Sequence, residues 1–331
     1  MKKKLIILIV LSFVLFEGCW VLRMGVRSIP DVLFNSPDSV TNKIKDPIKP
    51  DVRLSALWVG HSTVLLQIYD KVIIFDPVFN DVIGGLVMRR KEAGLDIKSI
   101  PNLDMVLVSH AHMDHMSLIS LSDLDDKFPK AKLIFPSGDE EYLPDYDMDM
   151  IRMKTGNSFK RGYVGETKVF DSVKVTAVFA EHFGGRYGLD SYLWNTPGCT
   201  GYIVEYRDVC IFYAGDTAYD DEAYKEIGRK YKIDLALIPI GPCRDCYTIK
   251  QFTHVTSYGA LLMLDDLNAG YMIPVHYGIL TYGNDPYQPE KVLRELLDGK
   301  GGGSNDELHR FSNLKKQVKI LTEGEQVVFD N

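Results

Sequence analysis

The 331-residue chain lacks the features that mark several large protein classes. It carries 38 Lys and Arg against 45 Asp and Glu, a formal net charge of −7, with no long run of like charges. We therefore expect no nucleic-acid partner, because nucleic-acid-binding surfaces are basic. No G-x-G-x-x-G motif and no repeat of fixed period is present, which argues against a dinucleotide-binding fold and a solenoid. The 46% hydrophobic content suffices for one large α/β domain or two modest ones.

Cysteine is scarce, with five residues in the whole chain. Cys243 and Cys246 form a single C-x-x-C, which lacks the second pair of a zinc ribbon and the βαβ context of a thioredoxin-like motif. A local disulfide and two unrelated thiols both remain open for this pair. Cys210 lies in the apolar run 209–213, so we predict that it belongs to the core.

The only long apolar run stands at the N-terminus. Three lysines precede residues 5–16, which are apolar except for Ser12, a pattern typical of a secretory signal. The run is too short to span a bilayer unless it continues to Leu22. Residues 15–19 resemble a bacterial lipoprotein cleavage box ending at Cys19, whereas a buried N-terminal helix is the alternative. We expect residues 1–22 to be a signal peptide or membrane anchor of an exported protein, membrane-associated in a bacterial cell envelope.

The remaining chain divides into two parts. Residues 23–50 contain four prolines among polar residues and predict a linker or a strap on the domain surface. Residues 51–331 predict one α/β domain, a layered sandwich in which strands and helices alternate. The predicted strands are 54–58, 63–68, 71–75, 105–108, 132–135, 168–170 and 174–180, and the predicted helices are 117–124, 221–230, 257–264 and 289–297. Residues 317–321 and 326–329 predict a closing hairpin.

Histidine is also scarce, yet three of the eight histidines lie within residues 110–115. His110, His112, Asp114 and His115 follow the predicted strand 105–108, so they occupy a loop at its C-terminal end. Imidazole nitrogens and a carboxylate oxygen suit Zn²⁺ or another divalent ion. A solvated loop that happens to contain histidine is the alternative.

Three further strands end on a residue that can bind a metal. The segment 175–180 leads into Glu181 and His182, 211–214 leads into Gly215 and Asp216, and 272–275 leads into His276. One such junction means little, but three of them after H-x-H-x-D-H indicate a metal centre assembled from strand ends.

In order and spacing, these residues resemble the metallo-β-lactamase fold hydrolases over residues 52–331. The resemblance implies an α/β fold of the αββα four-layer sandwich type and two Zn²⁺ ions, or other divalent ions. By this resemblance His110, His112 and His182 hold one ion, Asp114, His115 and His276 hold the second, and Asp216 bridges them. A water shared between two such cations has its pKa lowered toward neutrality, so hydroxide is available for hydrolysis.

Three more residues are placed to support this centre. Asp76 follows the strand 71–75 and is expected to accept a hydrogen bond from a ligand imidazole, with a plain turn residue as the alternative. His61 is expected to support the metal loop from behind. His254 is expected to protonate a leaving oxygen or to hold a phosphate oxygen, the alternative being a structural histidine. The expected catalytic residues are His254 and the metal-binding Asp114.

The segments 58–63, 75–79, 238–241 and 251–255 resemble the phospholipase D group that hydrolyses N-acylphosphatidylethanolamine. The resemblance implies a phosphodiesterase that acts on a phospholipid or another phosphodiester, with a membrane surface as partner. Related sugar-phosphate lactonases share the W-x-G-H start, so a lactonase or a soluble phosphodiesterase on the same two-metal site remains the alternative. A non-catalytic zinc protein is the third reading. The sequence does not indicate an oligomeric state.

Overall fold

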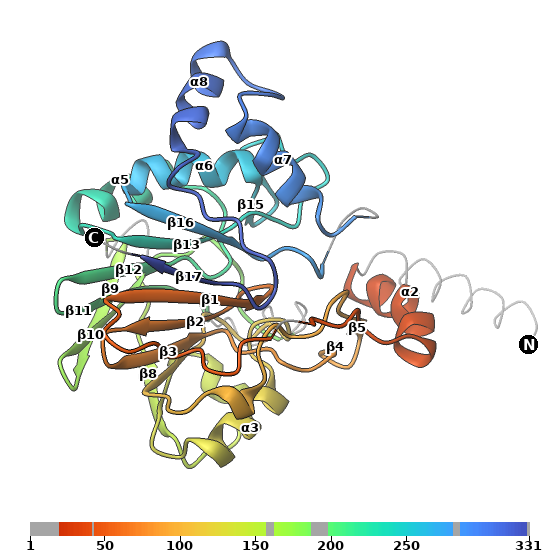
Figure 1. Ribbon diagram of the computed structural model, residues 1–331, viewed down its shortest axis with the longest axis vertical. Helices are drawn as coiled ribbons and strands as arrows, with labels where there is room; N and C mark the ends of the chain where they lie inside the picture. Colours follow the sequence, from red (N-terminus) through yellow and green to blue (C-terminus); the bar gives the residue numbers. More distant parts are fainter. Residues whose placement is uncertain (1–19, 42, 157–161, 187–197, 281–284, 330–331) are drawn as a thin grey trace, which may run out of the picture.

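The computed structural model describes residues 20–41, 43–156, 162–186, 198–280 and 285–329. Its centre is a pair of stacked β-sheets with helices on both outer faces (Figure 1). The first sheet consists, in spatial order, of β17 (Gln326–Phe329), β1 (Leu54–Gly60), β2 (Thr63–Ile68), β3 (Lys71–Phe75), β6 (Met105–Leu107), β7 (Lys132–Pro136) and β8 (Asp149–Met153). The second consists of β16 (Tyr271–Val275), β13 (Leu235–Pro239), β12 (Val209–Tyr213), β11 (Gly201–Tyr206), β10 (Val173–Val178) and β9 (Val164–Phe170).

The helices complete a four-layer αββα sandwich, as the sequence predicts. Below the first sheet lies α3 (Leu118–Lys127), and above the second lie α5 (Asp221–Lys230), α6 (Ser257–Leu267), α7 (Gln288–Leu297) and α8 (Asn305–Leu314) (Figure 1). One apolar cluster fills the space between the sheets and continues between the second sheet and α5 to α8, and a second fills the space between the first sheet and α3. Cys210 belongs to the first cluster, as predicted.

The topology gathers strand ends at one edge of the sandwich. β3, β6 and β7 are parallel in the first sheet, and β12, β13 and β16 are parallel in the second. Parallel strands that lie side by side end at the same edge, so the loops that follow them meet there. This edge carries the residues of the candidate site.

Two features near the C-terminal end of the chain differ from the sequence-based expectations. Residues 326–329 do not form a hairpin with 317–321: β17 pairs antiparallel with β1, whereas Val318 forms a bridge with Met272 beside the other sheet. The predicted hairpin is wrong because each arm satisfies its backbone groups on a different sheet edge. The helix α8 was not predicted, although Ser304 and Glu307 form a capping box at its start.

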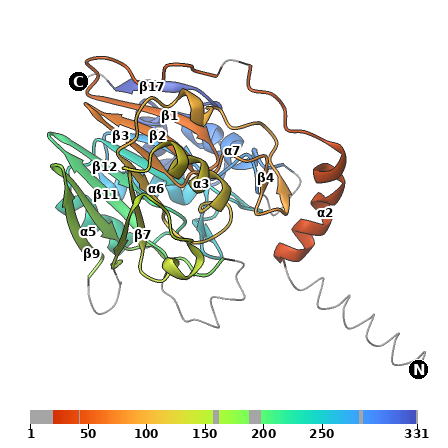
Figure 2. The same cartoon turned by 90° about the horizontal axis from the view of Figure 1, so that it is seen from below.

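The N-terminal region also contains an unpredicted helix. The predicted signal or anchor, residues 1–22, lies outside the described residues except for its last three positions. α2 (Trp20–Phe34) spans much of the expected linker and includes Pro30, a residue that argues against helix from sequence alone. It packs on the hairpin of β4 (Val82–Ile83) and β5 (Val87–Met88), where the Ser28 hydroxyl accepts from the Met88 amide (Figure 2). No helix in the described part of the chain is long and apolar enough to cross a membrane.

The carboxylate of Asp139 is buried in the interior of the protein. Asp139, the first residue of the short helix η2 (Asp139–Tyr142), is 1% exposed, and neither of its oxygens has a hydrogen bond within the described residues. Burial, reinforced by the charges of Glu140 and Asp76, raises the pKa of this carboxyl well above its ordinary value of 3.8. The folded protein therefore retains a proton here that the unfolded chain has lost.

We expect the Asp139→Asn substitution to stabilise the protein by about 1–3 kcal/mol at pH 7, because the folded wild type must take up a proton at this carboxyl and the neutral amide needs none. The folded pKa is raised, so the wild type is most stable below pH 3.8 and loses stability as pH rises through the folded pKa. The advantage of the variant should consequently shrink toward pH 3.5. Urea unfolding at several pH values measures the difference in free energy of unfolding between the variant and the wild type. Asp145→Asn, at an exposed position, is the control. An advantage that does not depend on pH would contradict the assignment.

Candidate metal centre

Seven side chains meet at the edge where the parallel strands end. His110, His112, Asp114 and His115 lie on the loop between β6 and α3, and the other three follow β10, β12 and β16. Those three are His182, Asp216 and His276. The structure thus brings together every residue that the sequence suggests as a metal ligand, although the chain separates them by up to 166 positions, from 110 to 276.

His110, His112 and His182 converge on one point. The His110 Nε2 lies 2.9 Å from the His112 Nδ1, which lies 3.2 Å from the His182 Nε2. Nitrogens bound tetrahedrally at about 2.0–2.1 Å from a zinc ion lie about 3.3 Å apart. The spacing of these three nitrogens therefore suits a single cation.

The remaining four side chains form a second group. The His276 Nε2 lies 3.4 Å from an oxygen of Asp114 and 3.0 Å from one of Asp216. The His115 Nε2 lies 3.6 Å and 3.3 Å from the same two carboxylates. Asp216 also lies 3.8 Å from the His182 Nε2, so its carboxylate stands between the two groups, where a bridging ligand would be.

Unsatisfied polar atoms indicate that this second group of side chains can bind a cation. The Nε2 atoms of His115 and His276 and the Oδ1 of Asp216 are buried and make no aligned hydrogen bond within the described part of the chain. Buried polar atoms normally have partners, so several unsatisfied atoms facing one another fit a group that could bind a cation. Imidazole and carboxylate donors fit a divalent metal ion, and they do not by themselves distinguish zinc from its neighbours in the first transition row.

The charges of the second group reinforce this conclusion. Burial lowers the pKa of His276, but the carboxylates of Asp216 and Asp114 outweigh burial and raise that pKa to about 9. Burial raises the pKa of Asp216, yet His115 and His276 outweigh it and hold the pKa well below 3.8. The carboxylates stay ionised and attract positive charge, whether protons or metal ions.

Three of the candidate ligand histidines, His115, His182 and His276, are held by the protein at the opposite ring nitrogen, Nδ1. Asp76 lies 2.6 Å from the His115 Nδ1, and its carboxylate also accepts from the Ser109 amide and hydroxyl and from the Tyr213 hydroxyl. The structure therefore places Asp76 where the sequence suggests, against a ligand imidazole. Such contacts fix the tautomer and the orientation of the ring. Asp76 has a φ of 40°, a left-handed conformation that its three partners hold in place.

Two backbone carbonyls orient two of the candidate ligand histidines, and sequence reasoning missed both carbonyls. The Gly241 oxygen accepts from the His276 Nδ1 at 2.7 Å, and the Thr253 oxygen accepts from the His182 Nδ1 at 3.1 Å. Carbonyl groups are present at every residue, so no sequence signal identifies them. Ser109 and Tyr213 were missed for a related reason, since nothing in the sequence links them to Asp76.

The two other histidines lie against the cluster. His61 contacts Asp114, with 2.9 Å between its Nε2 and Oδ2, and burial together with the charge of His276 lowers its pKa to about 4. Its backbone oxygen accepts from the Trp58 indole and from the His276 amide. The His254 Nδ1 lies 3.5 Å from Asp216, and its ring stacks 5.4 Å from that of His276. His61 therefore faces Asp114 from the buried side, and His254 faces Asp216.

A glycine is required beside the bridging position. Gly215 has a φ of +59°, and a Cβ built there would lie 2.7 Å from the Cβ of Ser109. Any side chain would push Asp216 away from the loop that carries His110.

These features agree with the comparisons to known proteins. Residues 71–277 match the family model described as the beta-lactamase superfamily domain, which is more than half of the chain. The chain belongs to the beta-lactamase superfamily. A protein from Sulfurisphaera tokodaii, described as a metal-dependent hydrolase, is 30% identical over 72% of this chain and 90% of its own length. The N-acyl-phosphatidylethanolamine-hydrolyzing phospholipase D 1 of Caenorhabditis elegans is 26% identical over 79% of this chain and 74% of its own length.

Solved structures agree on the fold. A possible metal-dependent hydrolase from Veillonella parvula superposes with a TM-score of 0.60 over 84% of this chain and 100% of its own, at 14% identity. Such low identity shows the metallo-β-lactamase fold alone. The family, the fold and the cluster of donors together make this chain a metal-dependent hydrolase of the metallo-β-lactamase type.

Proposed function

We propose that the protein is a phosphodiesterase that hydrolyses N-acylphosphatidylethanolamine-type phospholipids with two divalent metal ions, zinc being the expected one. The observation that carries the substrate class is an apolar rim beside a polar, buried centre. Phe183 is 42% exposed, and its ring lies 4.7 Å from that of His112 and 4.6 Å from that of His182. Phe252, two residues before His254, is 71% exposed. Exposed aromatic side chains next to a catalytic centre suit a substrate with hydrocarbon chains.

In this proposal, water attacks phosphorus and the bond to the head-group oxygen breaks, which yields a phosphatidic acid and an N-acylethanolamine. Divalent cations in such a site lower the pKa of water and offset the charge that develops on the phosphoryl oxygens. His110, His112 and His182 would hold one cation, and Asp114, His115 and His276 the other. Asp216 would join the two groups, since its carboxylate lies within 3.8 Å of a histidine from each. His254 would donate a hydrogen bond to the phosphoryl group from the side of Asp216.

The N-terminal region supports a membrane surface as the place of action. We propose that residues 1–22 attach the exported protein to a membrane, through a lipid on Cys19 or an uncleaved helix. α2 continues from this segment and exposes apolar side chains on its outer side, including Ile29, Leu33 and Phe34, which are 49%, 65% and 82% exposed. Apolar side chains on a helix that follows an anchor suit the headgroup region of a bilayer.

The test offers purified, zinc-loaded protein N-acylphosphatidylethanolamine in mixed micelles and, separately, a panel of lactones, with products identified by mass spectrometry. We expect phosphatidic acid and N-acylethanolamine, and in ¹⁸O-water the label should appear in the phosphatidic acid. Turnover of lactones without lipid cleavage would overturn the phospholipase proposal in favour of the lactonase alternative. Turnover of water-soluble diesters alone would favour a soluble phosphodiesterase.

A matched pair of variants tests the apolar rim. Phe252→Ser should raise KM for micellar lipid several-fold and leave the hydrolysis of bis-p-nitrophenyl phosphate unchanged, because only the lipid contacts the rim. Val169→Ser on β9 is the control, since Val169 is 64% exposed on the edge strand farthest from β16. Equal losses with both substrates would indicate damage to the centre rather than loss of lipid contact.

A further inference from the structure

One loop supplies contacts to both groups of metal donors. Residues 240–256 connect β13 to α6, and within them the Gly241 carbonyl accepts from His276 and the Thr253 carbonyl accepts from His182. His254 on the same loop faces Asp216. The Val255 amide donates to the Thr217 carbonyl, which ties the loop to the residue that follows Asp216. The position of this loop thus determines how two ligand rings, one from each group, are oriented.

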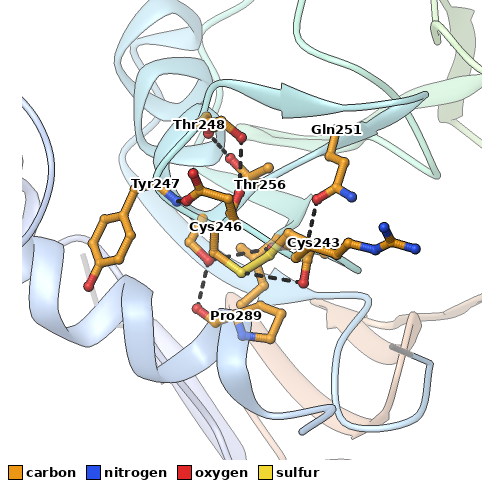
Figure 3. The surroundings of a disulfide bond; sticks show 12 residues. Cys243, Cys246, Tyr247, Thr248, Gln251, Thr256 and Pro289 are labelled. Atoms are coloured by element: carbon orange, nitrogen blue, oxygen red, sulfur yellow. Dashed lines mark hydrogen bonds between the residues drawn. A yellow bond between two sulfur atoms is a disulfide. The ribbon is translucent and has the colours of Figure 1, made fainter. Parts of the chain in front are cut away.

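Regular secondary structure contributes little to holding this loop. Its only strands are the two-residue β14 (Lys250–Gln251) and β15 (His254–Val255), which pair with each other. The segment next to Gly241 is instead closed by the disulfide between Cys243 and Cys246, whose Cα atoms lie 5.3 Å apart (Figure 3). Of the two readings that the sequence left open for this pair, the structure shows the disulfide.

The disulfide lies where it can fix both carbonyls. Cys243 is two residues from Gly241, and Cys246 accepts through its carbonyl from the Tyr258 amide in the first turn of α6. The Arg244 amide, inside the disulfide ring, donates to the Gln251 side chain at 2.6 Å, two residues before Thr253 (Figure 3). Both cysteines are buried, 2% and 1% exposed. The disulfide closes the segment 243–246, and the hydrogen bonds of this segment connect it to Gln251 near Thr253 and to α6.

We infer that the Cys243–Cys246 disulfide is a positioning device for the metal centre, which holds the Gly241 and Thr253 carbonyls against His276 and His182. This inference rests on the proposed metal-dependent function. Without the disulfide the loop samples more conformations, and each imidazole loses the fixed orientation that makes it a good ligand. The effect differs from a general loss of stability because it reaches the ions through specific ring nitrogens.

The test compares Zn²⁺ affinity and stability in the full chain. In the double variant Cys243→Ser/Cys246→Ser, Zn²⁺ affinity measured by competition with 4-(2-pyridylazo)resorcinol should fall about 10–100-fold, the usual effect of losing the contacts behind metal ligands. The difference in Tm between the metal-free variant and the metal-free wild type should be much smaller than the increase in Tm that Zn²⁺ produces in the wild type. The d–d spectrum of the Co²⁺-loaded variant should also broaden. Cys210→Ser, a buried free cysteine in β12, is the control and should keep wild-type Zn²⁺ affinity.

A reduction experiment keeps the inference testable if the double variant does not fold. A phosphine reductant and water convert the wild-type disulfide into two thiols and a phosphine oxide, after which the reductant is removed anaerobically and the thiols are counted. Zn²⁺ affinity should then fall as in the variant and recover on reoxidation. Unchanged affinity in the variant or the reduced protein would overturn the inference. A wild type that binds no Zn²⁺ would instead overturn the proposed function.

Discussion

Replacing Asp216 with alanine is expected to abolish the paired metal site and to lower kcat/KM for a phosphodiester by roughly 1,000-fold or more. The Asp216 carboxylate lies 3.0 Å from the His276 Nε2 and 3.8 Å from the His182 Nε2, so it is shared by both groups of donors. Two cations a few ångströms apart repel each other strongly in a buried site, and an anion shared between them offsets part of that repulsion. The variant should bind one ion at most.

Metal content by mass spectrometry and the rate of hydrolysis test this expectation together. Asp216→Asn, which keeps the size and removes the charge, should behave like the alanine variant, since the charge is what matters. His309→Ala is the control because His309 lies on the exposed side of α8. If Asp216→Ala bound two ions and retained the wild-type rate, the bridging role would be wrong.

The sequence predicts those parts of the centre in which an apolar strand is followed directly by metal-binding side chains. Residues 105–115 combine a short apolar strand with a dense set of donors, and β6 and its loop follow that pattern. His182, Asp216 and His276 each come directly after an apolar strand. Strand ends of a parallel arrangement must meet at one edge, so local sequence was enough to bring these residues together.

The parts that the sequence could not predict depend on contacts between distant segments. β17 pairs with β1 at the edge of the first sheet, whereas Val318 pairs with Met272 at the edge of the second. Which edge accepts each segment depends on the rest of the fold, and no pattern within residues 317–329 indicates it. In α2, Pro30 suggested a break, yet packing on β5 stabilises the helix in spite of it. The carbonyls of Gly241 and Thr253 become visible only once the loop is folded. A C-x-x-C motif indicates a possible disulfide, but not that the disulfide stands beside a metal ligand.

Replacing His254 with alanine is expected to lower kcat about 100-fold or more and to leave metal content unchanged. Its ring stands beside those of His182 and His276, 5.0 Å and 5.4 Å away, with its Nδ1 3.5 Å from Asp216. Burial, together with the charges of His182 and His276, lowers its pKa well below 6.5, although Asp216 opposes the shift. Nearby cations act in the same direction as burial, because they disfavour an imidazolium. The neutral ring keeps one N–H, which suits a hydrogen bond to a phosphoryl oxygen better than proton transfer to the leaving group.

The choice of leaving group distinguishes these two roles of His254. If the ring protonates the leaving oxygen, its loss should lower the rate for diesters of aliphatic alcohols far more than the rate for diesters of p-nitrophenol. The p-nitrophenolate leaving group departs without a proton. If the ring donates a hydrogen bond to phosphoryl oxygen, both kinds of diester should lose the same factor, and His254→Gln, which retains an N–H, should restore part of the rate. We expect the second pattern. A loss confined to aliphatic leaving groups would assign proton donation to His254 and leave the rest of the centre as described.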